Sequence, residues 1–427
     1  MFTQLAERRE RLAASLGMID GVLLIGAGLP VPLPENTDQV YPFRAHSEFF
    51  YVTGLECPGA IVAFDPHDGL RTGWRLFVPD VTESERIWEA RQQVAGEPLA
   101  ALSAWITERR NRPVAQLGAP SPCAYADLAL TVKTREAFTH ARRPKDEREI
   151  AVMHRAASAT AAGYSRTSGL ITPGVTERAL QIELEAEFFR HGATRTGYGT
   201  IVGTGPNSAV LHFEPTSRAA QPGEFVLIDA GAEVDRYVID VTRTYVAGTP
   251  SPFQRDLYQV VLSAQENAIS RCLAGSEWRE VHLRCAVELS DGLVSLGLMS
   301  GSAESLVEQD AHLLFFPHGL GHLVGLGVRD ASGTLPGRSR STRSSLQSLR
   351  LDLPLAPGFV VTVEPGLYFI PALLNNRESR ARYRDAVVWD KVEPHLGIGG
   401  VRIEDNVLVT SGAPDVLTAA IPKVLRT

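Results

Sequence analysis

The chain has 427 residues, 44% hydrophobic and 21% charged, which is typical of a globular protein with more than one domain. Its formal net charge of −7 argues against a protein that binds the phosphate backbone of a nucleic acid over most of its surface. No apolar run approaches the ~20 residues of a membrane span, and no secretory signal follows the charged N-terminus. We therefore expect a cytoplasmic protein with neither a nucleic-acid nor a membrane partner.

The first third of the chain alternates strand-like and helix-like segments. Short apolar strands are expected at 21–28 ("GVLLIGAG"), 59–65 ("GAIVAFD") and 74–79 ("WRLFVP"). Residues 95–110 ("AGEPLAALSAWITERR") have the pattern of an amphipathic helix. This alternation predicts an α/β domain over residues 1–141.

A charged stretch with one proline, "ARRPKDEREI" at 141–150, marks the expected domain boundary. Beyond it, the sequence predicts helices and then mostly strands. The expected helices are 149–167, 179–192, 252–274 and 278–298, and the expected strands are 225–231, 237–245, 359–369 and 399–410. Runs of helices beside runs of strands favour an α+β domain over residues 142–427.

The four cysteines are scattered without the spacing of a zinc or redox motif. We expect buried free thiols rather than disulfides, and the four are Cys57, Cys123, Cys272 and Cys285.

Four carboxylates stand in or at the end of apolar strands. They are Asp229, Asp240, Glu364 and Glu404. The first two are eleven residues apart, so a hairpin could carry both onto one face of neighbouring strands. The alternative is that each carboxylate pairs with an arginine, and Arg236, Arg243 and Arg402 are available. Because few cations lie in these strands, two divalent metal ions explain all four carboxylates better.

Two histidines, His318 and His322, lie four residues apart in "FFPHGLGHLVGLGVRD" at 315–330. That spacing suits one face of a helix, but the proline and glycines of the segment weaken a helix. If His322 supplies the single nitrogen ligand, the oxygen-rich set suits Mn²⁺ better than a soft metal. Two such ions, ~4 Å apart, can hold a bridging hydroxide as nucleophile and polarise a carbonyl, which is the chemistry of hydrolysis.

At these residues the sequence resembles the pita-bread metallopeptidases, a family that includes prolidase, aminopeptidase P, methionine aminopeptidase and creatinase. "YPFRAHSEFFYVTGLECPGAIVAFD" is similar to the creatinase-type N-terminal domain, and "RRPKDEREIAVMHRA" to the start of the catalytic domain. The five signature segments follow in order: "TIVGTGPNSAVLHF", "VLIDAGAEVDRYVIDVTRTY", "PHGLGHLVGLGVRD", "VTVEPGLYF" and "GGVRIEDNVLVT". The resemblance implies a C-terminal pita-bread catalytic domain of the α+β class, preceded by a smaller α/β domain.

Position by position, the resemblance implies the roles of the site residues. The implied metal ligands are Asp229, Asp240, His322, Glu364 and Glu404, holding two divalent ions, Mn²⁺ ahead of Co²⁺ or Zn²⁺. The implied catalytic residues are His212, His318 and Glu364, and the implied substrate contacts are His212, His318, Arg329, Arg350 and Tyr368. Thr242 and Arg402 correspond to residues that hold the ligands in place. For His212 and Tyr368, core packing is the alternative, and for Arg350 an ordinary surface position.

The chain departs from the family at one position. Family peptidases read "GxxVHD" after the histidine turn, whereas this chain reads "GLGVRD", with Arg329 in place of a catalytic histidine. Arginine stays charged, so it can donate hydrogen bonds but cannot shuttle a proton. It could bind substrate, or it could pair with Asp330 and leave the pocket.

Within the family, prolidase is the most similar branch, which predicts a dipeptidase that cleaves the Xaa-Pro bond. The alternatives are an aminopeptidase P that acts on longer Xaa-Pro peptides, and a weakly active member used as a binding module. The resemblance also implies a homodimer whose substrate is a small peptide with proline in the second position.

Overall fold

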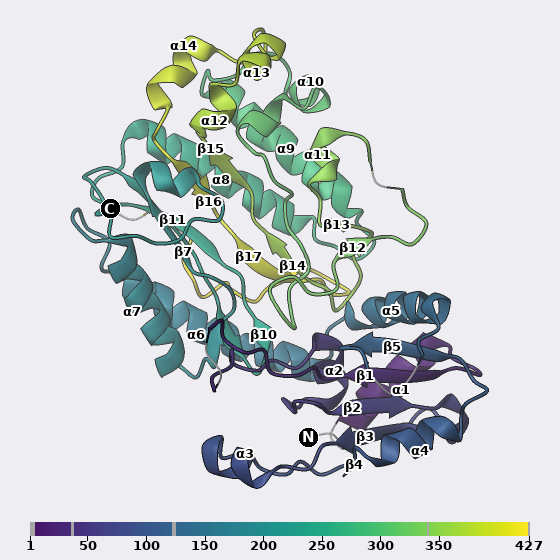
Figure 1. The fold of residues 1–427 in the computed structure, drawn as a ribbon. Coiled ribbons are helices and arrows are strands. Elements are labelled where there is room, and N and C mark those ends of the chain that lie inside the picture. Colours follow the sequence, from purple (N-terminus) through teal and green to yellow (C-terminus); the bar gives the residue numbers. More distant parts are fainter. Residues whose placement is uncertain (1–4, 36–37, 122–124, 340, 426–427) are drawn as a thin grey trace. The chain divides into compact units, whose positions relative to one another are not determined.

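The computed structural model describes residues 5–35, 38–121, 125–339 and 341–425 (Figure 1). The chain divides into two compact units, residues 1–142 and 143–427. Within the described residues, no helix is long and apolar enough to cross a membrane. Cys57, Cys272 and Cys285 are buried free thiols, as predicted, whereas Cys123 lies outside the described residues.

The first unit contains a five-stranded mixed sheet in the order β4-β3-β2-β1-β5. Its strands are β1 (Val22–Gly26), β2 (Ile61–Phe64), β3 (Trp74–Val78), β4 (Glu97–Pro98) and β5 (Val114–Gly118). Its helices are α1 (Ala6–Leu16), α2 (Ser47–Thr53), α3 (Glu83–Trp88), α4 (Ala101–Thr107) and α5 (Leu128–Arg142), with a short 3-10 turn, η2 (Pro66–Asp68). The three expected strands are confirmed as β1, β2 and β3.

The helix expected at 95–110 is shorter than predicted. Glu97 and Pro98 form β4, which pairs in parallel with β3, and α4 begins only at Ala101. Gly96 and Pro98 are poor helix residues, and sheet pairing takes the segment that periodicity alone assigned to the helix.

The second unit begins with α6 (Glu147–Ser168), whose capping box joins Asp146 and Glu149, and continues with α7 (Glu177–Arg190). The long helices α8 (Pro252–Ser270) and α9 (Trp278–Ser295) also lie where the sequence predicts them. The shorter helices are α10 (Ala303–Glu308), α11 (Ser344–Gln347), α12 (Pro371–Leu374), α13 (Arg377–Arg382) and α14 (Trp389–Val392), with 3-10 turns η3 (Gly205–Ala209), η4 (Ala311–Leu314) and η5 (Glu393–His395).

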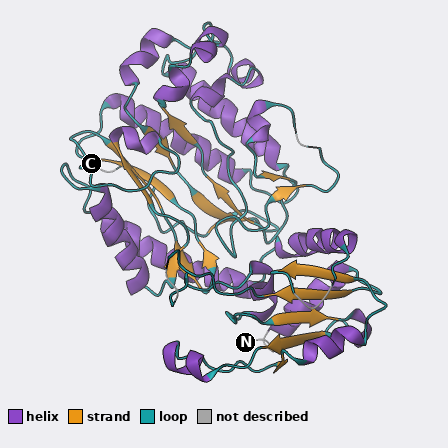
Figure 2. Ribbon diagram, in the orientation of Figure 1, coloured by secondary structure: helices purple, strands orange, loops and turns teal. Residues whose placement is uncertain are grey.

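The strands of this unit form several small sheets (Figure 2). They are β6 (Arg195–Thr196), β7 (Ile201–Thr204), β8 (Phe225–Asp229), β9 (Ala232–Val234), β10 (Tyr237–Val238), β11 (Thr242–Val246), β12 (Gly333–Thr334), β13 (Leu351–Asp352), β14 (Val360–Val363), β15 (Gly366–Tyr368), β16 (Gly400–Arg402), β17 (Asp405–Leu408) and β18 (Asp415–Val416). The sheet orders are β10-β9-β6, β11-β8-β7, β12-β13, β14-β17-β18 and β15-β16. Helices α6 and α7 contact β6, β7, β9 and β10, whereas α8 and α9 contact β13 to β16.

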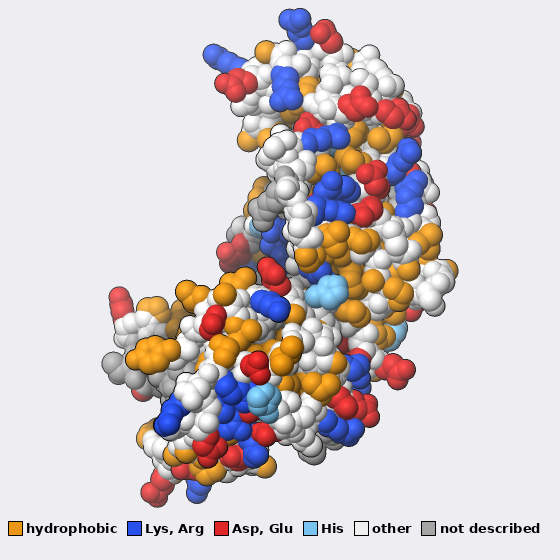
Figure 3. Space-filling view, turned by 90° about the vertical axis from the view of Figure 1, so that its right-hand side faces the viewer, with side chains coloured by type: hydrophobic (Ala, Val, Ile, Leu, Met, Phe, Trp, Pro, Cys, Tyr) orange, Lys and Arg blue, Asp and Glu red, His pale blue; other side chains and the backbone are white. Residues whose placement is uncertain are grey.

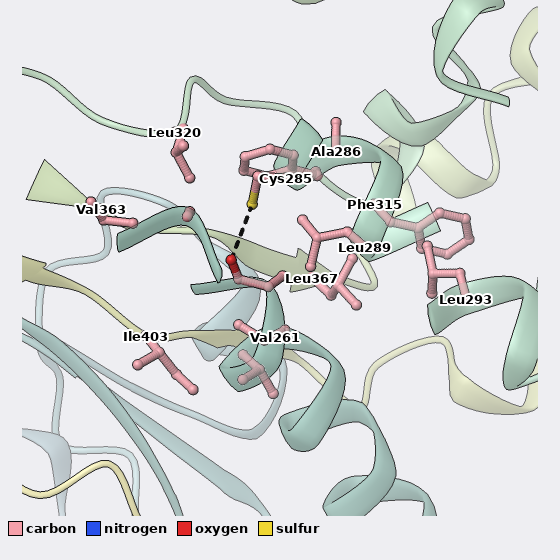
Figure 4. Close-up of a cluster of buried hydrophobic side chains, with 14 of the residues drawn as sticks. Val261, Cys285, Ala286, Leu289, Leu293, Phe315, Leu320, Val363, Leu367 and Ile403 are labelled. Carbon is pink, nitrogen blue, oxygen red and sulfur yellow. Dashed lines mark hydrogen bonds between the residues drawn. The ribbon is translucent and has the colours of Figure 1, made fainter. Parts of the chain in front are cut away.

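A large hydrophobic core fills the space between α8, α9 and the strands they cover (Figure 4). Leu320, Val363 and Ile403 belong to this core and are fully buried. Cys285 on α9 also lies there, its Sγ 3.9 Å from the carbonyl oxygen of Ala264 on α8. This thiol therefore acts as a small core side chain.

Acidic and basic side chains are intermixed on the face shown in Figure 3.

Candidate active site

Asp229 and Asp240 lie on the two arms of one antiparallel hairpin. Asp229 ends β8, which pairs antiparallel with β11, with Thr242 opposite Asp229. The same register continues through β9 and β10, where Val234 lies opposite Tyr237, although these two strands belong to a separate small sheet. The expected hairpin that carries both aspartates is therefore confirmed. The two arms pack closely at Gly231, where a Cβ would lie 1.6 Å from the Ile239 carbonyl oxygen.

The histidine turn is irregular backbone, as its glycines predict. His322 donates its backbone N–H to Thr362 Oγ1 (3.0 Å) and accepts at its carbonyl from the Thr362 N–H (2.8 Å). A Cβ on Gly321 would lie 2.0 Å from the Thr362 carbonyl oxygen. Glycine at this position therefore lets the turn lie directly on the segment that leads to Glu364.

Glu364 and Glu404 lie at the ends of strands rather than within them. Glu364 directly follows β14, and Glu404 lies between β16 and β17. Their preceding neighbours, Val363 and Ile403, are both fully buried in the core (Figure 4). Core packing of the neighbouring side chain thus fixes the position of each carboxylate.

The predicted ligand set converges in space. Asp229, Asp240 and Glu404 each present an oxygen, and these atoms all lie within 4.8 Å of one another. His322 Nε2 lies 3.5 Å from Asp240 Oδ2 and 3.7 Å from Glu364 Oε1. The structure therefore brings together all five residues that the sequence predicted as metal ligands.

Arginine pairing does not account for these carboxylates. Arg402 contacts Asp229 (Nη2 to Oδ2, 2.6 Å), but Arg243 pairs instead with Asp405 (2.7 Å), outside the cluster. Burial, together with the neighbouring carboxylates, raises the pKa values of Asp240 and Glu404 well above their usual range. Burial also raises the pKa of Glu364 to about 7. Among the described residues, Arg402 is the only arginine that forms an ion pair with a carboxylate of the cluster, so the cluster gathers more negative charge than this pairing offsets.

The donor set fits divalent cations. His322 Nδ1 lies 3.1 Å from the Leu323 carbonyl oxygen and must donate to it, which leaves the Nε2 lone pair facing the carboxylates. Burial lowers the pKa of His322 to about 4, so the ring is neutral near pH 7. Four carboxylates and one neutral imidazole form an oxygen-rich set of the kind that Mn²⁺ prefers.

A chain of hydrogen bonds runs from Arg402 to the first histidine of the turn. Arg402 Nη1 donates to Tyr368 Oη (2.9 Å), and Tyr368 Oη lies 2.9 Å from His318 Nε2. His318 Nδ1 lies 2.9 Å from the Gly319 carbonyl oxygen, so it donates there and Nε2 accepts from the tyrosine. Burial lowers the pKa of His318 to about 3. Tyr368 is fully buried, so packing in the core fixes the position of the hydroxyl that joins Arg402 to His318.

The remaining predicted residues lie around this cluster. Arg329 and Arg350 are both exposed, and the charge of each lowers the pKa of His322. The pKa of Arg350 is lowered mainly by its partial burial and further by the charge of Arg329. Asp330 pairs with Lys145 (3.1 Å), so the alternative in which Arg329 pairs with Asp330 is wrong.

His212 lies in a turn after η3 and its side chain is exposed, so core packing does not explain it. It is close enough to His318 to contribute to the lowered pKa of that ring.

Three residues that support the cluster were not predicted. Tyr198 donates its hydroxyl to Asp229 Oδ1 (2.7 Å). Asn406 brackets Asp240 by bonding both its backbone N–H (2.9 Å) and its carbonyl oxygen (2.6 Å), and Thr362 contacts His322. Thr362 and Asn406 each stand two residues from a ligand, so the two-residue period of a strand could have revealed them. Tyr198 follows no such period.

Comparison with known proteins agrees with this geometry. The chain belongs to metallopeptidase family M24, whose pattern matches residues 151–411. The aminopeptidase P N-terminal domain matches residues 5–102. The fold is thus the pita-bread catalytic fold preceded by the N-terminal domain of the prolidase and aminopeptidase P branch, as the sequence predicted.

The similar proteins are Xaa-Pro aminopeptidases. The chain is 34% identical over 434 residues to the Xaa-Pro aminopeptidase of Escherichia coli K12, covering 93% of this chain and 91% of that protein. It is 31% identical over 421 residues to a probable Xaa-Pro aminopeptidase of Botryotinia fuckeliana (95% and 91% covered). Zinc-substituted E. coli aminopeptidase P in complex with product superposes with a TM-score of 0.79 at 29% identity, covering 99% and 96% of the two chains. These relatives favour the aminopeptidase alternative over the dipeptidase we ranked first.

Proposed function

We propose that this protein is a metal-dependent aminopeptidase that releases the N-terminal residue from peptides with proline in the second position. The observation that carries the proposal is the buried cluster of four carboxylates and one neutral imidazole, on the fold of Xaa-Pro aminopeptidases. The intact ligand set argues against a binding module that has lost its activity.

The five ligands would hold two divalent ions, for which we propose Mn²⁺, with Co²⁺ and Zn²⁺ as alternatives. When bound, the ions would supply an activated water and polarise the scissile carbonyl. We assign catalytic roles to Glu364, His212 and His318. His318 is neutral and has both ring nitrogens engaged, so its proposed role is to line the pocket in a fixed orientation.

A narrower dipeptidase activity is the second candidate, and Arg329 and Arg350 favour it. Neither forms an ion pair with another described residue, although the two guanidinium groups lie close enough to affect one another. Two cations held together beside a metal site can bind a carboxylate. If that carboxylate is the C-terminus of the substrate, short peptides are preferred.

The test is cleavage of an Xaa-Pro-Yaa tripeptide, an Xaa-Pro dipeptide and an Xaa-Ala-Yaa tripeptide with added Mn²⁺. We expect release of Xaa from both proline peptides and little from the alanine peptide. Failure to cleave any Xaa-Pro peptide with Mn²⁺, Co²⁺ or Zn²⁺ would overturn the proposal.

Asp240→Asn provides the first mutational prediction. Removing one buried ligand should reduce the bound metal below two ions per chain and lower kcat/KM by at least about a hundredfold. Metal analysis after dialysis checks the stoichiometry. Asp415→Asn, at an exposed position of β18, is the matched control and should behave as wild type. Two tightly bound ions and full activity in Asp240→Asn would contradict the ligand assignment.

A further inference from the structure

Another buried carboxylate, Glu177, has no part in the metal cluster. It is the first residue of α7, and its side chain is fully buried. A buried carboxylate is unfavourable unless hydrogen bonds replace its lost hydration. Hydrogen bonds from threonine and asparagine lower the pKa of Glu177 despite its burial, so the group is charged near pH 7.

Five donors converge on Glu177, and they come from both ends of one loop. Oε1 accepts from the backbone N–H and the hydroxyl of Thr204 (both 2.9 Å) and from Asn207 Nδ2 (2.9 Å). Oε2 accepts from the backbone N–H (3.0 Å) and the hydroxyl (2.6 Å) of Thr216. One carboxylate thus ties the end of β7 to a residue twelve positions further along the chain.

Helix capping does not explain these contacts. The N-cap of α7 is Thr176, whose side chain accepts from the Ala179 N–H (3.1 Å). The carboxylate of Glu177 faces the 204–216 loop instead of the first turn of its own helix.

The loop between these two ends carries His212. It contains η3 and the turn in which the exposed His212 ring approaches His318. A second anchor ties the same loop to β16, where Ser208 Oγ accepts from the Gly400 N–H (2.9 Å). Arg178 also donates to the carbonyl oxygens of Pro215 (2.6 Å) and Thr216 (2.9 Å), so the loop that carries His212 is held by Glu177 at both ends and by these additional bonds.

We propose that Glu177 is a positioning residue, whose carboxylate clasps the 204–216 loop and so holds His212 against the substrate. The inference rests on the proposed peptidase function, because it assigns His212 a substrate contact. Glutamine at this position would direct an amide N–H₂ toward one set of donors, so one side of the clasp must open. Misplacing a substrate-contacting group by about 1 Å lowers catalytic efficiency by roughly a hundredfold.

The experiment is a double-mutant cycle of Glu177→Gln and His212→Ala on an Xaa-Pro-Yaa peptide. We expect Glu177→Gln to lower kcat/KM by roughly tenfold to a hundredfold with bound metal unchanged. The double variant should lose little more than His212→Ala, because the clasp acts through that histidine. Glu183→Gln, on the same helix as Glu177, removes a surface ion pair with Arg166 of α6; it is the control and should leave kcat/KM unchanged.

Hydrogen exchange over residues 205–216 provides a readout independent of activity. It should be faster in Glu177→Gln than in Glu183→Gln, and Thr216→Val should show the same change if Glu177→Gln fails to fold. Unchanged exchange, or additive losses in the cycle, would overturn the inference. A wild-type protein that cleaves no Xaa-Pro peptide would instead overturn the proposed function, while the exchange result would still report on the clasp.

Discussion

At the scale of single residues, the site depends on how each charge is or is not compensated. Arg402 is the clearest case, because its guanidinium bonds Asp229, Thr242 Oγ1 (3.0 Å) and Tyr368 at once. Thr242 in turn donates to Glu404 (2.7 Å). One arginine thus orients two carboxylates, one directly and one through a hydroxyl, and leaves the others for cations.

Arg329 and Arg350 give a prediction about the substrate carboxylate. A charge-assisted pair is worth ~1.5–3 kcal/mol, or roughly tenfold to a hundredfold in kcat/KM. Arg329→Ala and Arg350→Ala should each cause such a loss on an Xaa-Pro dipeptide, and much less on the same dipeptide as its C-terminal amide. Steady-state kinetics on the two substrates make the measurement.

Arg384→Ala is the control for this pair, because Arg384 is an exposed arginine whose one ion-pair partner among the described residues is its neighbour Asp385. Equal losses on the acid and the amide would mean that neither arginine binds the carboxylate. If Arg329→His raises activity well above wild type, the arginine lowers peptidase activity, and the alternative of a weakly active binding module gains support.

At the scale of elements, the packing of short segments determines the site. Asp405, next to Glu404, is fully buried and binds Arg243 and Thr418 (2.7 Å each). Arg243 also donates to the carbonyl oxygen of Glu404 (2.6 Å). The network of Asp405, Arg243 and Thr418, in which the charges are paired, therefore lies next to the carboxylate cluster. It holds β17 and the segment after β18 in place.

Gly321→Ala should disturb both the fold and the metal site. The new Cβ would lie 2.0 Å from the Thr362 carbonyl oxygen, so the histidine turn must move. Overpacking of this kind typically costs ~1–3 kcal/mol in the free energy of unfolding, and displacing His322 should weaken metal binding. Urea unfolding and metal content after dialysis test both effects.

Gly169→Ala is the matched control, because its Cβ would meet only the Arg166 carbonyl oxygen at 3.6 Å and its φ is −75°. That substitution should be neutral or stabilising by ~0.4–1 kcal/mol. If Gly321→Ala keeps wild-type stability and metal content, the close packing of the turn does not matter to the site.

The sequence predicted the long elements, the residues that meet in the carboxylate cluster, and the hairpin that joins two of them. Helices such as α6 and α8 have capping boxes and sustained periodicity, which are local signals. The hairpin that carries Asp229 and Asp240 was predicted correctly, because the eleven-residue spacing leaves room for two paired arms and a tight turn, which falls at Asp235 and Arg236. Tyr198 was missed because its contact with Asp229 depends on tertiary packing.

At the scale of the whole molecule, the metal cluster links stability to pH. In protein whose metal has been removed by a chelator, three carboxylates have raised pKa values in the folded state. The pKa of Glu364 is about 7, and those of Asp240 and Glu404 are well above their usual range. Their protonation stabilises the folded state at low pH, and this contribution is lost as the pH rises through the folded-state values. Buried histidines act in the opposite direction, because burial lowers the pKa values of His318 and His322 to about 3 and about 4.

The two contributions act in different pH windows. Above about pH 6.5, histidines are neutral in both the folded and the unfolded state and contribute no slope. Chelated protein should therefore lose stability as the pH rises from about 6.5 to about 8.5. Added Mn²⁺ should reverse the trend, because it binds the charged carboxylates. At a hundredfold excess over Kd, one ion adds about 2.7 kcal/mol.

Thermal unfolding at several pH values across this window, with chelator or with Mn²⁺, tests the linkage. The midpoint should fall with rising pH in chelator and should rise on adding Mn²⁺, most strongly at the highest pH. The double variant Asp240→Asn, Glu404→Gln removes the two groups with the most strongly raised pKa values, so most of the slope in chelator should disappear with them. If the unfolding midpoint of the wild-type protein in chelator stays flat or rises across this pH window, the carboxylates do not destabilise one another by repulsion. The cluster would then need no cation to be stable, which would remove the main structural argument for a dinuclear metal site.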